Sequence, residues 1–276
     1  MRYLPFCLLS LALLACNAAT VSEHRETADT ASSTPAPSPE PPAPPVPVPV
    51  VAPQAASASA PIRVRVAGPD LLLGKFDPSS RPDFAAVGKP YSDKPGMYLQ
   101  KQALEAFKKM WDAARKDGVT LKIISATRTF SQQKNIWEGK WARFAKEAPE
   151  PAARAKKIME YSAMPGASRH HWGTDVDLND LNNSAFETGG KHQKTYEWLV
   201  THAHEHGFCQ PYTAGRPSGY NEEKWHWSYT PLAQPFLAQY EKEVTDAHLT
   251  GFKGAETALQ IQVVKHYALG INTHCK

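Results

Sequence analysis

Apolar residues recur every three or four positions between residues 99 and 114, which is the spacing of one face of an amphipathic helix. Gly118 follows the last of these positions, where a glycine commonly ends a helix because it adopts the left-handed backbone conformation at little cost. The pattern predicts a helix that begins near Leu99 and ends before Gly118. Its apolar positions are Leu99, Ala103, Phe107, Met110, Trp111 and Ala114.

Helical spacing recurs in later segments, and short apolar runs between them predict strands. Thr129 or Ser131 can cap a second helix by accepting hydrogen bonds from the free backbone N–H groups of its first turn. Because helices and strands do not alternate regularly, we expect an α+β fold in which helices flank one small antiparallel sheet. The second helix should carry Ile136, Trp137, Trp141 and Phe144, further helices are expected over 191–206, 232–247 and 255–267, and strands over 119–125, 175–178 and 225–229.

Residues 1–15 have the pattern of an export signal. A single positive charge, Arg2, precedes an apolar run that is too short to span a bilayer. The run ends in Leu-Leu-Ala-Cys at residues 13–16, which resembles the bacterial lipobox, whose cysteine is lipidated. Asn17 is not an aspartate, which favours the outer over the inner membrane. We therefore expect an exported lipoprotein that faces the periplasm and is anchored in the outer membrane through Cys16. An ordinary cleaved signal with an incidental cysteine is the alternative.

Proline occupies many of the positions between residues 34 and 53. Such a stretch favours extended polyproline II at about 3.1 Å per residue, so that these residues would span roughly 60 Å. Residues 16–61 are expected to form the lipid anchor and a disordered stalk, and residues 62–276 a single folded domain. Within it, residues 62–66 alternate apolar residues with arginine, as in an edge strand, and residues 67–98 are expected to form long ordered loops.

The chain contains four cysteines. Cys7 would leave with the signal and Cys16 is the candidate for lipidation, so Cys209 and Cys275 remain. Outside the cytoplasm, two remaining cysteines most simply form a disulfide. Two free buried thiols are the alternative.

The charge pattern limits the class of partner. The formal net charge is only +4, and no cluster of lysine and arginine occurs, so nucleic acid is not an expected partner. Beyond the signal no apolar run is long enough to cross a membrane, and we expect membrane contact through the lipid anchor only. The chain is expected to act as a monomer.

Two segments concentrate side chains that bind metal ions. Residues 168–177 read Ser-Arg-His-His-Trp-Gly-Thr-Asp-Val-Asp, and residues 221–229 read Asn-Glu-Glu-Lys-Trp-His-Trp-Ser-Tyr. Nitrogen and oxygen ligands from two separated segments suit a zinc ion that keeps one coordination position open. Since alternate residues of a strand share a face, Asp175 and Asp177 are expected to point the same way. Spacing alone leaves as candidate ligands His170, His171, Asp175, Asp177 and His226.

Together these segments resemble the D-alanyl-D-alanine carboxypeptidase family of zinc peptidases, which includes the vancomycin-resistance D,D-carboxypeptidases and D,D-dipeptidases. The resemblance rests on Ser-x-His-x-x-Gly-x-x-x-Asp followed by Glu-x-Trp-His and covers about residues 99–229. It implies that His170, Asp177 and His226 bind Zn²⁺. It also implies that Glu223 is the general base.

The same resemblance implies further residues around a substrate pocket. A Ser-x-x-Arg-x-x-x-x-Gln segment of the family is matched by Ser125, Arg128 and Gln133. Arg128 would bind substrate and stabilise the oxyanion, Gln133 would support the substrate end of the pocket, and Ser168 would line it. The tryptophans that flank the ligands, and that we expect to wall the pocket, are Trp172, Trp225 and Trp227.

Three neighbouring residues leave alternatives open. The family often has a small residue where Asp175 stands, so Asp175 could support a ligand or change the charge of the pocket. His171 competes with His170 as a ligand. Glu222 competes with Glu223 as the base.

The resemblance implies hydrolysis of peptidoglycan stem peptides that end in D-Ala-D-Ala. Three protein ligands leave zinc a fourth position for water and lower the pKa of that water towards about 7. Glu223 would take the proton and hand it to the leaving amine, while Arg128 would share the negative charge of the carbonyl oxygen with the metal. An L,D-carboxypeptidase or a peptidoglycan endopeptidase on the same zinc site is an alternative. A non-catalytic wall-binding module with a structural zinc is another.

Overall fold

A four-stranded antiparallel sheet lies at the centre of residues 68–276, which are the residues that the computed structural model describes. Its strand order is β3-β4-β6-β5, so that β4 and β6 are the inner strands. The α+β fold with a small antiparallel sheet is confirmed, and the strand predicted over 175–178 has the predicted bounds. The strands are β3 (Ile123–Ser125), β4 (Asp175–Leu178), β5 (Phe208–Cys209) and β6 (His226–Tyr229).

Several predictions concern the N-terminal part of the chain. The signal peptide, the lipidation site Cys16, the stalk and the strand over 62–66 lie outside the described residues and stay predictions. Within residues 68–276, none of the helices is both long enough and apolar enough to cross a membrane.

A second, two-stranded sheet occupies part of the segment predicted as loops. It pairs β1 (Phe84–Val87) with β2 (Met97–Gln100) in antiparallel register. Leu99 lies opposite Ala85 in this pair, and the N–H of Gln100 donates to Gly173 O at 2.9 Å. These backbone bonds hold Leu99 in a strand, so the first helix begins two residues later than predicted, at Lys101, and contains the other predicted apolar positions.

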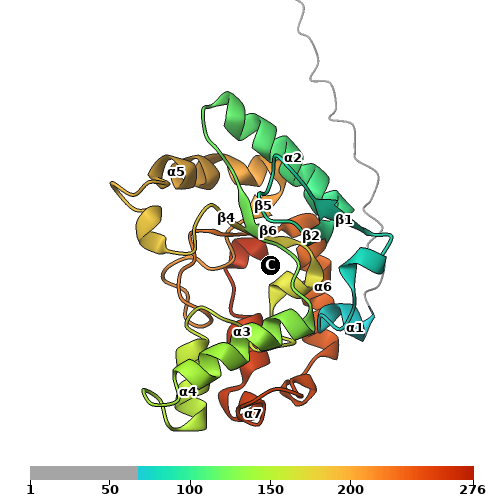
Figure 1. Ribbon diagram of the computed structural model, residues 1–276, viewed down its shortest axis with the longest axis vertical. Coiled ribbons are helices and arrows are strands. Elements are labelled where there is room, and N and C mark those ends of the chain that lie inside the picture. The colour runs from blue at the N-terminus through green and yellow to red at the C-terminus, as the bar shows by residue number, and fades with distance from the viewer. Residues whose placement is uncertain (1–67) are drawn as a thin grey trace, which may run out of the picture. The chain divides into compact units, whose positions relative to one another are not determined.

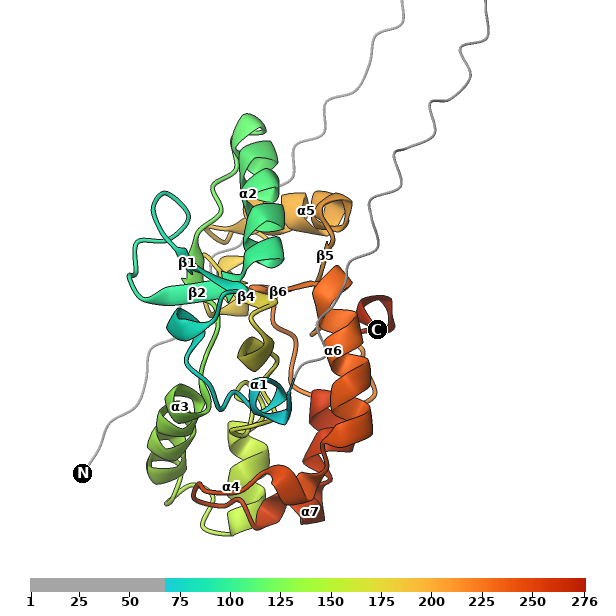
Figure 2. The same cartoon turned by 90° about the vertical axis from the view of Figure 1, so that its right-hand side faces the viewer.

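Helices cover both sides of the four-stranded sheet. They are α1 (Pro69–Leu72), α2 (Lys101–Lys116), α3 (Phe130–Arg143), α4 (Pro151–Ile158), α5 (Gln193–His202), α6 (Thr230–Glu243) and α7 (Thr257–Ile261). Figures 1 and 2 show α2 and α5 on one side of the sheet and α3, α4 and α7 on the other. Two apolar clusters result, of which one joins α2 to the sheet and the other gathers α1, α4, α6 and α7.

The side-chain alternation of the inner strands places the polar residues between these clusters. Val176 and Leu178 of β4 and Trp227 of β6 pack with α2. Because neighbouring residues of a strand point to opposite faces, Asp175 and Asp177 lie on the other face. The sheet therefore presents its carboxylates away from α2.

The helix predictions were correct where the local signal was strong. Thr129, not Ser131, caps α3, with a reciprocal bond between its backbone and Gln132. The segment 191–206 forms α5 and a 3₁₀ turn that ends at Gly207, whose φ is 78°. The single helix predicted over 255–267 is interrupted, because Gln262 has a φ of 55°. Helix α4 was not predicted.

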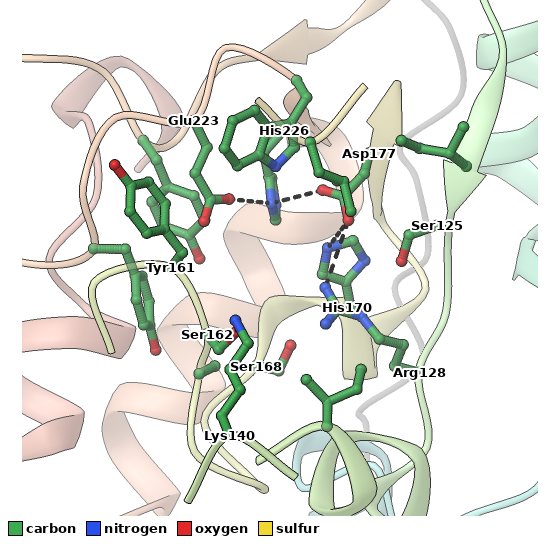
Figure 3. A pocket seen from close by; sticks show the side chains of 17 residues that line it. Ser125, Arg128, Lys140, Tyr161, Ser162, Ser168, His170, Asp177, Glu223 and His226 are labelled. Atoms are coloured by element: carbon green, nitrogen blue, oxygen red, sulfur yellow. Dashed lines mark hydrogen bonds and ion pairs between the residues drawn. The ribbon is translucent and has the colours of Figure 1, made fainter. Parts of the chain in front are cut away.

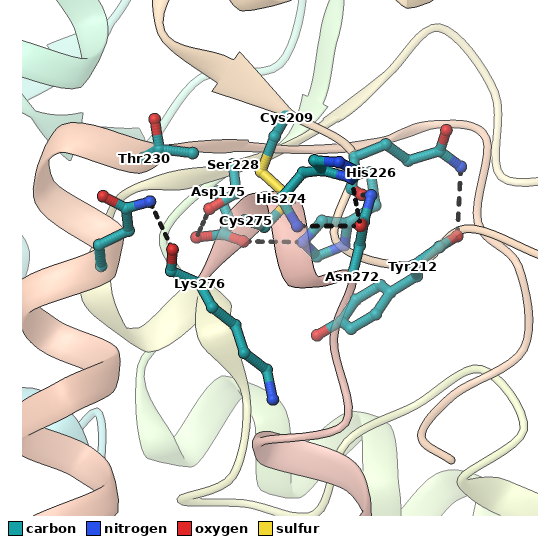
Figure 4. Close-up of a disulfide and its surroundings, with 12 residues drawn as sticks. Asp175, Cys209, Tyr212, His226, Ser228, Thr230, Asn272, His274, Cys275 and Lys276 are labelled. Carbon is teal, nitrogen blue, oxygen red and sulfur yellow. Dashed lines mark hydrogen bonds and ion pairs between the residues drawn. A yellow bond between two sulfur atoms is a disulfide. The ribbon is translucent and has the colours of Figure 1, made fainter. Parts of the chain in front are cut away.

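The predicted disulfide between Cys209 and Cys275 is present and fastens the C-terminus to β5 (Figure 4). Asn272 adds two bonds beside it: its N–H donates to Pro211 O at 2.8 Å, and its Nδ2 donates to Gln210 O at 3.2 Å. The last turn of the chain is thus held against the segment that follows β5.

We predict that the Cys209→Ala/Cys275→Ala double variant is less stable by about 4 kcal/mol, because a cross-link between residues 66 apart removes conformational entropy from the unfolded chain. Urea denaturation of the oxidised protein and of the variant would measure the difference. An unchanged free energy of unfolding would contradict the prediction. Wild-type protein whose disulfide has been reduced should show the same loss in free energy of unfolding and gives a second measurement of it.

Candidate active site

Three of the predicted side chains converge on the polar face of the sheet. The donor atoms of His170, Asp177 and His226 all lie within 4.8 Å of one another, and all three residues are buried. His170 Nε2 is 3.3 Å from Asp177 Oδ2, and His226 Nδ1 is 3.2 Å from Asp177 Oδ1 (Figure 3). We call these three residues the ligand cluster.

Strand pairing and one tight turn explain why these residues meet. Asp177 of β4 lies directly opposite His226 of β6 in the antiparallel register. His170 belongs to a 3₁₀ turn that ends at Gly173, whose φ is 72°. A Cβ at Gly173 would lie 2.4 Å from a ring carbon of Phe84, so only glycine fits between the turn and β4.

The hydrogen bonds of the two imidazoles direct one nitrogen of each ring into the cluster. His170 Nδ1 lies 2.8 Å from Ala126 O, and since a carbonyl only accepts, Nδ1 carries the hydrogen and Nε2 presents its lone pair. His226 Nε2 lies 3.0 Å from Asp175 Oδ1, which leaves Nδ1 facing Asp177 and Glu223. Both rings are therefore oriented as metal-bound histidines are.

The cluster fits a divalent cation. His170 Nε2 and Asp177 Oδ1 are buried polar atoms without an aligned hydrogen bond among residues 68–276. Burial alone would lower the pKa of His226, but its hydrogen bonds to Asp175, Asp177 and Glu223 raise that pKa well above its ordinary value. A positive charge is thus favoured at the centre of these carboxylates. Two imidazole nitrogens and a carboxylate oxygen are the donor set of catalytic zinc sites.

Asp175 supports His226 from behind. It is completely buried, and its Oδ1 accepts from both His226 Nε2 and Arg169 Nε at 3.0 Å. Its Oδ2 accepts from Thr174 Oγ1 at 2.5 Å and from Ser228 Oγ at 3.1 Å. Burial raises the pKa of Asp175, but Arg169 and His226 outweigh it and hold the pKa well below its usual range. All its acceptor positions are directed at these donors, so Asp175 orients His226 rather than joining the cluster.

His171 points away from the cluster. The N–H of Gly166 donates to His171 Nε2 at 3.0 Å, so the ring hydrogen is on Nδ1, which lies 2.6 Å from Arg128 O. Burial lowers the pKa of His171 to about 3, which keeps the ring neutral. Both nitrogens are occupied by backbone groups, which leaves His170 as the ligand candidate of the pair.

Glu223 is held beside the cluster by its backbone. Its N–H donates to Tyr212 O at 2.9 Å, and its carbonyl accepts from Gln210 Nε2 at 3.1 Å. Its Oε2 lies 3.2 Å from His226 Nδ1. Burial raises the pKa of Glu223, and the hydrogen bond to His226 opposes this only in part. A carboxylate with a raised pKa is suited to accept and return a proton.

The residues on either side of Glu223 are also fixed. One side-chain amide, that of Asn183, donates to Glu222 O at 2.8 Å and accepts from the N–H of Lys224 at 3.0 Å. Glu222 itself forms an ion pair with Lys224 at 3.7 Å and does not line the cavity. Asn183 and Gln210 carry no signal in the sequence, because contacts from side chains to a distant backbone leave no periodic pattern.

A cavity of about 450 Å³ opens onto the cluster. Arg128 reaches it with one nitrogen 3.6 Å from Asp177 Oδ2, while its other terminal nitrogen donates to Gln133 Oε1 at 2.9 Å. Gln133 lies behind Arg128 and also donates to Ala163 O, so it orients the arginine and does not line the cavity. Ser168 lines the cavity, as predicted from the resemblance.

Of the three tryptophans expected to wall the pocket, the structure places only Trp225 there. Trp172 and Trp227 are buried in the two apolar clusters, so that part of the prediction was wrong. Further residues of the wall, which were not predicted, come from α3 and from the segments around the cluster. These are Ile136, Lys140, Tyr161, Ser162, Leu181, Tyr212 and Tyr220.

Comparison with known proteins finds relatives that match part of the chain. The chain is 31% identical over 136 residues to "Putative carboxypeptidase YodJ" of Bacillus subtilis (strain 168), covering 48% of this chain and 46% of that protein. It is 30% identical over 125 residues to a D-alanyl-D-alanine carboxypeptidase of Enterococcus faecalis, covering 45% of each. The matched region thus spans about half the length of these relatives. An uncharacterized protein of Haemophilus influenzae is 32% identical over 90 residues, covering 28% of this chain and 69% of that protein.

Among solved structures, a mutant of the vancomycin resistance D,D-pentapeptidase VanY in complex with Zn(II) has 26% sequence identity and a TM-score of 0.43, covering 54% of this chain and 86% of that chain. The family model described as "VanY: D-alanyl-D-alanine carboxypeptidase" matches residues 96–232. That range contains every member of the ligand cluster together with Glu223 and Arg128. The chain belongs to the VanY family of D-alanyl-D-alanine carboxypeptidases.

Proposed function

We propose that this chain is a zinc-dependent D-alanyl-D-alanine carboxypeptidase that removes the terminal D-Ala of peptidoglycan stem peptides. The observation that carries the proposal is the convergence of His170, Asp177 and His226 with Glu223 at the inner end of the cavity. The curated relative from Enterococcus, which bears the same activity in its name, supports the choice of substrate. Export and a lipid anchor, predicted from residues 1–16, would bring the domain to the cell wall.

The residues of this chain divide the chemistry between them. When bound, zinc supplies a Lewis acid beside the scissile carbonyl and lowers the pKa of the attacking water. Glu223 accepts the proton of that water and returns it to the leaving amine. Arg128, held by Gln133 at the edge of the cluster, stabilises the negative charge that develops on the carbonyl oxygen.

Two alternatives use the same donor set. An L,D-carboxypeptidase or an endopeptidase would differ in the walls of the cavity. A wall-binding module with a structural zinc is disfavoured because structural sites are closed by four protein ligands, whereas three converge here, facing a cavity. Mass spectrometry of tetra- and pentapeptide muropeptides incubated with the zinc-loaded protein separates the activities. Loss of one alanine from the pentapeptide alone is the result expected for a D,D-carboxypeptidase.

We predict that Glu223→Gln lowers kcat/KM for the pentapeptide by about 10²- to 10⁴-fold, the usual contribution of a general base, and leaves zinc bound. Glu222→Gln is the matched control, since its carboxylate does not line the cavity, and should retain activity. Product release followed by mass spectrometry and zinc content measured by atomic absorption are the readouts. Full activity of Glu223→Gln would refute the assigned base.

We predict that His170→Ala no longer binds zinc stoichiometrically, whereas His171→Ala still does. His171→Ala instead lowers the free energy of unfolding by about 2–4 kcal/mol, because it leaves the N–H of Gly166 and the carbonyl of Arg128 buried without partners. Zinc titration and urea denaturation of each variant distinguish the two roles. The opposite pattern would exchange the assignments of the two histidines.

We predict that Asp175→Asn weakens zinc binding by about 10- to 100-fold, because the carboxylate that orients and polarises His226 is replaced by a neutral amide. Thr174→Val is the control: it removes another donor to Asp175 but leaves the bond to His226. Competition with a chromophoric chelator measures both affinities. Equal affinity of wild type and Asp175→Asn would show that Asp175 serves folding alone.

A further inference from the structure

One cationic side chain in the cavity has no role in the chemistry described above. Lys140 lies on the face of α3 that also presents Ile136 to the cavity, four residues away. Its Nζ is 2.5 Å from Ser162 Oγ, and Ser162 is itself buried with 7% of its surface exposed. Figure 3 shows this pair on the side of the cavity opposite Glu223 and His226.

Within the described residues, the ammonium group of Lys140 forms no ion pair. Among residues 68–276 its Nζ donates to Ser162 Oγ and lies within ion-pair distance of no carboxylate, and Glu223 acts on it only through longer-range attraction. Lys134, on the same helix, differs in this respect, because it pairs with Glu138 and donates to Gly251 O. A partly buried cation without a counterion is costly unless a ligand supplies one.

The charges of the cavity leave room for an anion. A divalent cation in the ligand cluster would neutralise the carboxylates of Asp177 and Glu223. The positive charges of Arg128 and Lys140 would then be left over. Arg128 is fixed near the cluster by its contacts with Asp177 and Gln133, so Lys140 is the cation available at the far end.

The hydrogen-bonding capacity of the pair suits a carboxylate. An ammonium group has three donors, of which Lys140 uses one on Ser162 Oγ. Because Ser162 Oγ accepts that bond, its own hydroxyl hydrogen remains free to donate. Two ammonium donors and one hydroxyl donor can therefore point at the same anionic group, and bonds to a charged acceptor are the strong ones.

We propose that Lys140 and Ser162 bind the free C-terminal carboxylate of the substrate peptide and thereby restrict the site to the last peptide bond. The inference rests on the proposed function, since it assigns the end of the substrate that is released. A peptide cut at an internal bond would present a neutral amide to Lys140 and leave its charge unpaired. The pair thus selects a carboxypeptidase over an endopeptidase reaction.

Binding and catalysis with two matched peptides test the proposal. The peptides end in D-Ala-D-Ala, one as the free acid and the other as the C-terminal amide. Zinc-loaded Glu223→Gln protein is titrated with each peptide by calorimetry, and active protein is assayed with each by mass spectrometry. We expect the acid to bind more tightly and to react with a higher kcat/KM, by about 10- to 100-fold, which is the usual effect of a hydrogen-bonded charge.

The variants assign the preference to Lys140. Lys140→Met should lose about 10- to 100-fold in kcat/KM on the acid, chiefly through KM, and should treat acid and amide alike. Lys140→Arg should restore part of the preference, and Ser162→Ala should weaken it. Lys134→Met is the matched control and should behave as wild type, because its side chain lies outside the cavity.

Two results would overturn the proposal. One is equal binding of acid and amide by the Glu223→Gln protein. The other is an equal loss on both peptides in Lys140→Met at unchanged zinc content and thermal stability. Failure of the proposed function can be distinguished from failure of this inference. If the proposed function is wrong, the wild type hydrolyses neither peptide. The calorimetric comparison still shows whether the protein prefers the acid to the amide.

Discussion

The antiparallel register of β4 and β6 is the constraint on which the rest of the site depends. It sets Asp177 opposite His226 and Asp175 opposite Ser228, so that one pair contributes ligand candidates and the neighbouring pair supports them. Because side chains alternate along a strand, a slip of one residue would turn both carboxylates into the apolar cluster under α2. The packing of Val176, Leu178 and Trp227 against α2 opposes such a slip.

A buried ion pair secures the same register from behind. Arg169 and Asp175 are 1% and 0% exposed, and they are joined at 3.0 Å while Arg169 also donates to Ser228 Oγ at 2.6 Å. Burying two charges costs desolvation energy that their attraction only partly offsets, so such a pair is poor evidence for net stability. Its effect here is to orient the His226 ring. Asp175 accepts the bond from His226 Nε2 only when the ring is turned so that Nδ1 faces Asp177.

Short-range patterns predicted the parts of the molecule that local chemistry determines. Capping by Thr129 and the strand over 175–178 could be predicted because each depends on residues adjacent in the sequence. The ligand candidates came from the spacing of family motifs, and the structure brings those residues together. Their roles as zinc ligands, and those of Glu223 and Arg128, stay predictions.

Other features depend on contacts that spacing does not encode. Helix α4 escaped prediction because only Ala155 and Ile158 of its residues are buried, too few for a periodic signal. Lys140 follows the helical period of α3, but the period does not say which face of that helix borders a cavity. Similarly, the side chain of Asn183 forms hydrogen bonds with the backbone of Glu222 and Lys224, which are 39 and 41 residues away in the sequence.

The C-terminus and the candidate base are linked through one residue. Gln210 follows Cys209 of the disulfide, and its side chain donates to the carbonyls of Tyr212 and Glu223. Asn272, three residues before Cys275, donates to the backbone carbonyl of the same Gln210. The covalent bond between β5 and the chain end therefore limits the movement of the segment that fixes Glu223. The disulfide between β5 and the C-terminus thereby also restrains the distance between the proposed base and His226.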